Sequence, residues 1–156
     1  MADMSSGGGL APTQDERTMA TLAHALQLIG AWIAPLIIFL VKRQSRFVSF
    51  HALQALLLQI CYMILVFTAT GGLFVLMFST LALHVGDKNA PPTAFFAFFP
   101  LIWLVFVGCG IFNLVIAIVY AIKAGQGEWA EYPLLGRLAR KMLKIGPGGA
   151  PLSAQA

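Results

Sequence analysis

Three stretches of this chain contain no lysine, arginine, aspartate or glutamate, and no other feature limits the possible folds so strongly. They cover residues 18–41, 47–86 and 89–122. Each is longer than the roughly 20 residues that an α-helix needs to cross a hydrocarbon core of about 30 Å. Because backbone polar groups must be paired inside hydrocarbon, segments of this kind form helices. The sequence therefore predicts an all-α, polytopic membrane protein.

The composition supports a bilayer environment for most of the chain. Only 10% of the 156 residues are charged and 59% are hydrophobic, against roughly a quarter charged in soluble domains. We expect a single transmembrane helical domain over residues 16–145. The two ends, residues 1–15 and 146–156, are rich in glycine, proline and small residues, a composition that favours disordered tails.

The number of crossings depends on the second stretch, which suits either one long helix or two short helices that turn at Gly71 and Gly72. Three spans place eight of the ten Lys and Arg residues on one side of the membrane, whereas a turn at the glycine pair divides them six to four. Cytoplasmic loops carry the excess of positive charge. We therefore expect three transmembrane helices, with four as the alternative, at about 18–41, 48–84 and 98–123.

This charge distribution also predicts a location and an orientation. The chain is expected in the bacterial cytoplasmic (inner) membrane as a multi-pass protein. Its N-terminus would lie outside and its C-terminus in the cytoplasm, because the more basic side faces inward.

A short amphipathic helix is predicted after the last span, at residues 133–144. Its leucines and Met142 lie roughly on one face and its basic residues on another, as in helices that lie at the membrane surface. A solvated helix is the alternative. We expect anionic lipid headgroups to meet the basic residues of this helix and of the loop after the first span, which are Lys42, Arg43, Arg46, Arg137, Arg140, Lys141 and Lys144. No aromatic platform accompanies these charges, so nucleic acid is not an expected partner.

Polar side chains within the spans recur at helical spacing and indicate which faces meet other helices. His24 shares a face with Gln27, and His51 with Gln54, while Asn113 belongs to a row of small residues at steps of four. Helices in membranes associate through small residues and through hydrogen bonds between polar side chains. We interpret these five polar residues as a helix-packing motif.

Histidines at membrane depth suggest a second use, because haem iron commonly takes a histidine ligand. His24 and His51 are therefore alternative axial ligands for haem or chlorophyll, although the chain has no Cys-x-x-Cys-His attachment motif. No catalytic residues are predicted, since the spans contain no Asp or Glu to act as acid or base. The two cysteines are isolated in the sequence, so no metal site is predicted.

Three segments resemble a known family. ERTMATLAHALQLIG, KRQSRFVSFHALQALLLQ and GEWAEYPLLGRL are similar to a widespread bacterial family of uncharacterised small membrane proteins. That family is related to the twenty-kilodalton subunit of the chloroplast inner-envelope protein import (Tic) translocon. The resemblance covers residues 16–138 and is most specific around His51.

The resemblance implies a compact helical bundle in which His51 and Gln54 fix contacts with the first span through His24. For the chloroplast relative it implies a role in a protein-conducting complex. We therefore expect a non-enzymatic subunit of a membrane complex, of the assembly or translocation type. It would associate with itself or with other membrane proteins. A cofactor-binding subunit and a passive pore are the alternatives.

Overall fold

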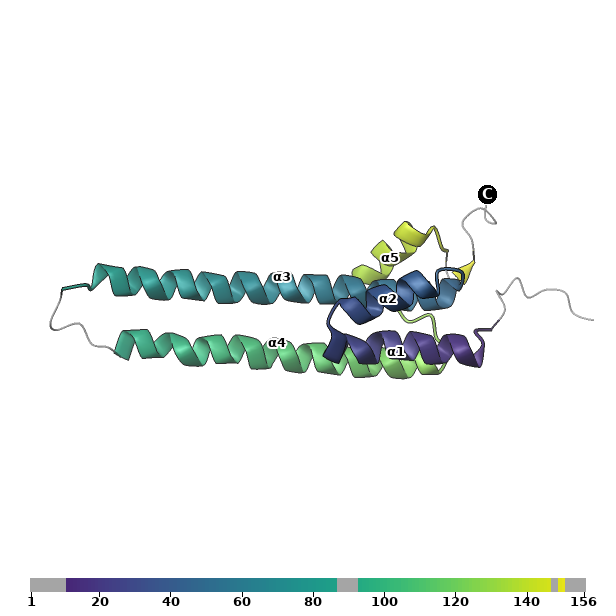
Figure 1. Ribbon diagram of the computed structural model, residues 1–156, viewed down its shortest axis with the longest axis horizontal. Helices are drawn as coiled ribbons and strands as arrows, with labels where there is room; N and C mark the ends of the chain where they lie inside the picture. Colours follow the sequence, from purple (N-terminus) through teal and green to yellow (C-terminus); the bar gives the residue numbers. More distant parts are fainter. Residues whose placement is uncertain (1–10, 87–92, 147–148, 151–156) are drawn as a thin grey trace, which may run out of the picture. The chain divides into compact units, whose positions relative to one another are not determined.

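The computed structural model describes residues 11–86, 93–146 and 149–150, and these residues are helical for most of their length (Figure 1). The helices are α1 (Gln14–Gly30), α2 (Ile33–Val41), α3 (Arg46–Leu83), α4 (Thr93–Gly125) and α5 (Leu135–Leu143). No strand occurs in the described ranges, which confirms the all-α class. Most of the two predicted disordered tails lies outside the described residues, although Gln14 and Asp15 already belong to α1.

The chain divides into two compact units. The first unit combines Met1–Gln59 with Val115–Ala156, and the second is Ile60–Leu114. The first unit therefore contains α1, α2, α5, the first turns of α3 and the last turns of α4. The second unit contains the remaining turns of α3 and α4.

The first apolar stretch, predicted as a transmembrane helix over 18–41, is not one continuous helix. It is interrupted at Ala31, whose φ is 47°, and the helices on either side have 17 and 9 residues. Neither is long enough to cross a bilayer. Among the described residues, α3 and the Phe96–Gly125 part of α4 are long and apolar enough to do so. The expectation of three or four spans was therefore wrong, and two candidates remain.

A proline explains where the first stretch breaks. In a continuous helix Pro35 could not donate to the carbonyl four residues earlier, and its ring would press against that carbonyl. That residue is Ala31, where the helix ends. In α2 the proline instead occupies the first turn, where no intrahelical donor is needed. The chain folds back here, and a Cβ on Gly30 would lie 2.7 Å from the Cβ of Ala34.

We expect Gly30→Ala to destabilise the fold by about 1–3 kcal/mol, because the added methyl overlaps Ala34 and forces the backbone to shift. Gly71→Ala is the matched control. Gly71 lies inside α3 with nothing within 4 Å of an added Cβ, so alanine should be neutral or stabilise by up to about 1 kcal/mol. Thermal unfolding in detergent, followed by circular dichroism, distinguishes the two. Equal shifts would contradict the close approach at Gly30.

Both candidate membrane helices expose apolar side chains. Only 11% of the most apolar part of each is buried, whereas a core helix of a soluble protein is mostly buried. In the second unit the exposed residues include Phe67, Val75, Trp103 and Leu104. Such a surface is suited to lipid. The alternative of a turn at Gly71 and Gly72 was also wrong, since α3 continues through both.

The first unit has a small core centred on Trp129. This indole packs against Phe47 and Phe50 of α3, with ring centroids 5.2 and 5.5 Å apart. The same apolar clusters include Ala20 of α1, Ala124 of α4 and Ala139 of α5. These alanines allow close approach of the helices around one large side chain. The core therefore holds the segment that follows α4 against the start of α3.

Candidate functional site

A chain of hydrogen bonds between buried side chains joins α1, α3 and the segment after α4. The Nε2 of His24 lies 3.1 Å from the Nδ1 of His51. The Tyr132 hydroxyl lies 3.0 Å from the Nδ1 of His24, and the Nε2 of His51 lies 3.0 Å from the carbonyl oxygen of Glu128. Both histidines are fully buried and Tyr132 is 3% exposed. We call these three side chains the histidine latch.

The direction of every hydrogen bond in the latch follows from the backbone carbonyl at its end. The Glu128 carbonyl can only accept, so the Nε2–H of His51 donates to it. In a neutral ring the Nδ1 of His51 then accepts, and the Nε2–H of His24 donates. The Nδ1 of His24 is left to accept from the Tyr132 hydroxyl. Every ring nitrogen is thereby used within the chain.

Burial keeps these groups in the neutral forms that this direction requires. It lowers the pKa of His24 to about 3, because a charged ring would lose its hydration. It raises the pKa of Tyr132 for the same reason. The latch is therefore an uncharged network at neutral pH.

Gln54 makes a second connection between α3 and the same segment. Its amide nitrogen donates to the Ala130 carbonyl at 3.1 Å, and its amide oxygen accepts from the Tyr132 backbone N–H at 2.7 Å. Gln54 is fully buried, so these bonds are shielded from competing water. A Cβ on Gly136 would lie 3.0 Å from the Gln54 oxygen. Glycine at position 136 therefore lets the backbone approach this amide closely.

The other two members of the predicted packing motif lack such bonds. Gln27 is fully buried, and neither of its amide atoms makes a hydrogen bond with a described residue. Gln27 also lowers the pKa of the Tyr132 hydroxyl, which places its amide beside that group without a hydrogen bond of ordinary geometry. Asn113 is 8% exposed, its amide oxygen has no hydrogen-bond partner among the described residues, and it belongs to the second unit.

Tyr132 is the member of the latch that the sequence did not single out. It lies outside the predicted spans, 108 positions from His24. The one available signal was its place in GEWAEYPLLGRL, a segment that carries the family resemblance. That resemblance assigned it no role.

The latch leaves the histidines unavailable as ligands in this arrangement. Each of their four ring nitrogens already has a partner in the chain. Coordination of a haem or chlorophyll metal would require one of these bonds to break. In the described ranges, no group of three or more His, Cys, Asp and Glu side chains is placed to hold a metal ion.

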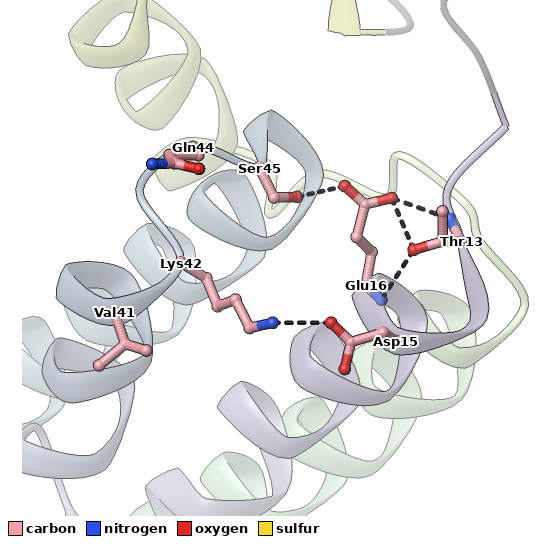
Figure 2. A pocket seen from close by; sticks show the side chains of 7 residues that line it. All are labelled: Thr13, Asp15, Glu16, Val41, Lys42, Gln44 and Ser45. Atoms are coloured by element: carbon pink, nitrogen blue, oxygen red, sulfur yellow. Dashed lines mark hydrogen bonds and ion pairs between the residues drawn. The ribbon is translucent and has the colours of Figure 1, made fainter.

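A second polar cluster joins the start of α1 to the residues just after α2 (Figure 2). Asp15 and Lys42 form an ion pair at 2.7 Å, and the Ser45 hydroxyl donates to Glu16 at 2.7 Å. Thr13 and Glu16 form a capping box at the start of α1. These residues line a pocket of about 540 Å³ together with Val41 and Gln44. We call the ion pair and the Ser45–Glu16 bond the hairpin clasp.

The clasp gives one predicted dependence on pH. The Ser45 hydroxyl lowers the pKa of Glu16 below its ordinary value of about 4.3. The stability gained from this is present above pH 4.3 and is lost as the pH falls through the lowered pKa. We expect Glu16→Gln, which retains the capping box, to weaken the decline in melting temperature between pH 5 and pH 3. The gain is under about 1 kcal/mol because the carboxylate is partly exposed. Parallel declines in both proteins would contradict this role.

The outer face of α5 combines exposed apolar and basic residues. Leu134, Leu138 and Met142 are 78%, 43% and 57% exposed, while Gly136 and Ala139 form the buried face. The predicted apolar face is thus largely turned outward. Of the predicted basic residues, Arg43, Arg46, Arg137, Lys141 and Lys144 are exposed.

Arg140 and Lys42 are held by acidic partners within the chain. Arg140 binds Glu131 at 2.5 Å, and its guanidinium lies 4.9 Å from the centre of the Phe50 ring. Lys42 is held by the clasp. These two cations therefore contribute to the fold of the first unit.

The chain matches a known protein family. A family model described as the magnetosome magnetite crystal formation protein family matches residues 15–139. The matched region contains the histidine latch, Gln54 and the clasp. No curated protein and no solved structure matches the chain, and none of these comparisons shows a relation to the chloroplast import subunit.

Proposed function

The chain belongs to the magnetosome magnetite crystal formation protein family, and from this membership we propose that it is a non-enzymatic assembly subunit of the membrane in which magnetite crystals form. Two long helices with exposed apolar side chains support its membrane location. Within the two functional types expected from the sequence, assembly and translocation, we propose assembly. The translocation type depended on the chloroplast relative.

The histidine latch is the observation that carries this proposal. A cofactor site or a catalytic site needs polar groups that can engage a ligand. Here both histidines, Tyr132 and Gln54 engage one another or the backbone, from elements far apart in the chain. Their arrangement favours a structural role, in which they hold the first unit in one shape. Partners would then contact its outer surface.

The span count supports a new orientation. Two crossings leave both ends of the chain on one side of the membrane, with nine of the ten Lys and Arg residues. Lys88, between the two spans, is alone on the other side. The positive-inside rule assigns the nine to the cytoplasm. We therefore propose that both termini are cytoplasmic, in place of the N-terminus outside that three crossings required.

Lipids and other membrane proteins are the proposed partners. The exposed Arg137, Lys141 and Lys144 accompany the exposed Leu138 and Met142 on and beside α5, a combination that suits anionic headgroups. The exposed apolar surface of the second unit is open to lipid, to a second copy or to another membrane protein.

The proposal is tested in a magnetite-forming bacterium whose own copy of the gene is replaced by variants. We expect His51→Ala to reduce crystal size or number, because the first unit loses its latch. His84→Ala is the matched control, since His84 is an exposed histidine just after α3. Electron microscopy measures the crystals, and immunoblotting of membranes measures protein level. Unaltered crystals after complete deletion of the gene would refute the role in magnetite formation.

A further inference from the structure

The turn between α1 and α2 exposes large apolar side chains. Ile29 is 88% exposed, and Trp32 and Ile33 are 40% and 51% exposed. Further along α2, Ile37, Leu40 and Val41 are 54%, 48% and 72% exposed. Large apolar side chains left exposed together, at a turn and along the helix that follows it, indicate a contact with a partner or a membrane.

At the opposite end of α1 and α2, polar side chains join the two helices. The clasp ties Asp15 to Lys42 and Glu16 to Ser45, which brings the start of α1 to the end of α2 (Figure 2). The two helices therefore form a hairpin. Its base carries the charged residues of the clasp beside the exposed Val41, and its tip is apolar.

The lengths of the helices exclude a crossing by either one. With 17 residues α1 is about 25 Å long, and with 9 residues α2 is about 14 Å long. Both are shorter than a hydrocarbon core of about 30 Å. A segment whose two charged ends are joined by an ion pair must also leave the membrane on the side where it entered.

From these observations we propose that the α1–α2 hairpin is a re-entrant membrane element. Its tip, around Ile29 and Ile33, inserts among lipid acyl chains from the side on which the clasp lies, and returns to that side. Trp32 lies at the tip, and tryptophan is favoured where headgroups meet acyl chains. The backbone at the turn departs from helical geometry and needs polar groups nearby. Insertion is therefore shallow, at the boundary between headgroups and acyl chains.

Lipid is the favoured occupant because the same chain carries two candidate membrane helices. The charged base and apolar tip match the two layers of one leaflet. This inference does not depend on a role in magnetite formation. It is tested in vesicles without any other protein.

The test uses full-length protein with Cys61→Ser and Cys109→Ser, reconstituted in phosphatidylcholine and phosphatidylglycerol vesicles. Single cysteines replace Ile29 at the tip and Gln14 and Gln44 at the base. A fluorophore on position 29 should be quenched several-fold more by nitroxide on the lipid acyl chains than one on position 44. Positions 14 and 44 should both react with an impermeant maleimide from the same side.

Three results would overturn the proposal. Reaction of positions 14 and 44 from opposite sides would mean that the stretch crosses the membrane. Quenching of position 29 by aqueous iodide would mean that the tip lies in water. Protection of position 29 from both quenchers would mean that protein, such as a second copy, covers it. Circular dichroism verifies folding, and Ile33→Cys takes the place of Ile29→Cys if the latter does not fold.

Discussion

Replacing His51 with alanine should lower the free energy of unfolding by about 3–5 kcal/mol. The substitution leaves the Nε2–H of His24 without its acceptor and the Glu128 carbonyl without its donor. The buried His24 nitrogen left unpaired costs about 1–3 kcal/mol, and the Glu128 carbonyl, which belongs to an exposed residue, costs less because water can reach it. The missing ring also opens a cavity beside Phe47 and Phe50, whose centroids lie 4.6 and 5.5 Å away.

The measurement is unfolding of purified protein in mixed micelles, with helical circular dichroism plotted against the fraction of denaturing detergent. His84→Ala serves again as control, because its exposed ring makes one bond to the carbonyl of Thr80, four residues earlier. We expect a change within about 1 kcal/mol there. A His51→Ala protein as stable as this control would show that the latch contributes little to the fold.

The second large effect is on the free energy of unfolding, which we expect to change in opposite directions when two buried glutamines are each replaced by leucine. Gln54→Leu removes the partners of the Ala130 carbonyl and the Tyr132 N–H, and we expect it to destabilise the fold by about 2–5 kcal/mol. Gln27→Leu removes an equally buried amide that makes no hydrogen bond to a described residue. Because burial of an unsatisfied amide is unfavourable, leucine should stabilise the fold by about 1–2 kcal/mol.

Both variants should be measured side by side in the same micelles, so that the general effect of replacing glutamine with leucine cancels. The informative quantity is the difference between the two changes in unfolding free energy. A difference near zero would mean that the Gln54 bonds are replaced by water. Destabilisation by Gln27→Leu would mean that the Gln27 amide has a partner in solution.

The sequence predicted the helices but not the course of the first one. Hydropathy over residues 18–41 is the same whether the chain crosses a bilayer or turns back, since both leave apolar side chains facing lipid. Proline does not resolve the question by itself. Pro35 lies four residues after a break, whereas α4 continues through Pro100. The difference lies in tertiary contacts such as the ion pair between Asp15 and Lys42, which no local pattern encodes.

The candidate site could be predicted in part, and for a definite reason. Helical spacing placed His51 and Gln54 on one stripe, and the family resemblance associated His51 with His24. Their other partners are backbone groups of Glu128, Ala130 and Tyr132. Every residue carries such groups, so the sequence has no signal for which of them meet a side chain. Their positions became apparent only with the path of the chain after α4.

The discontinuity of the first unit has a consequence for its biosynthesis. A ribosome makes His51 long before its acceptor, because 77 residues separate it from Glu128. At roughly 5–20 residues per second, about 4–15 s pass before the carbonyl that accepts from the His51 ring has been synthesised. The first unit is thus completed last, and a chain that ended at Gly125 would lack the backbone groups of Glu128, Ala130 and Tyr132 that hold His51 and Gln54.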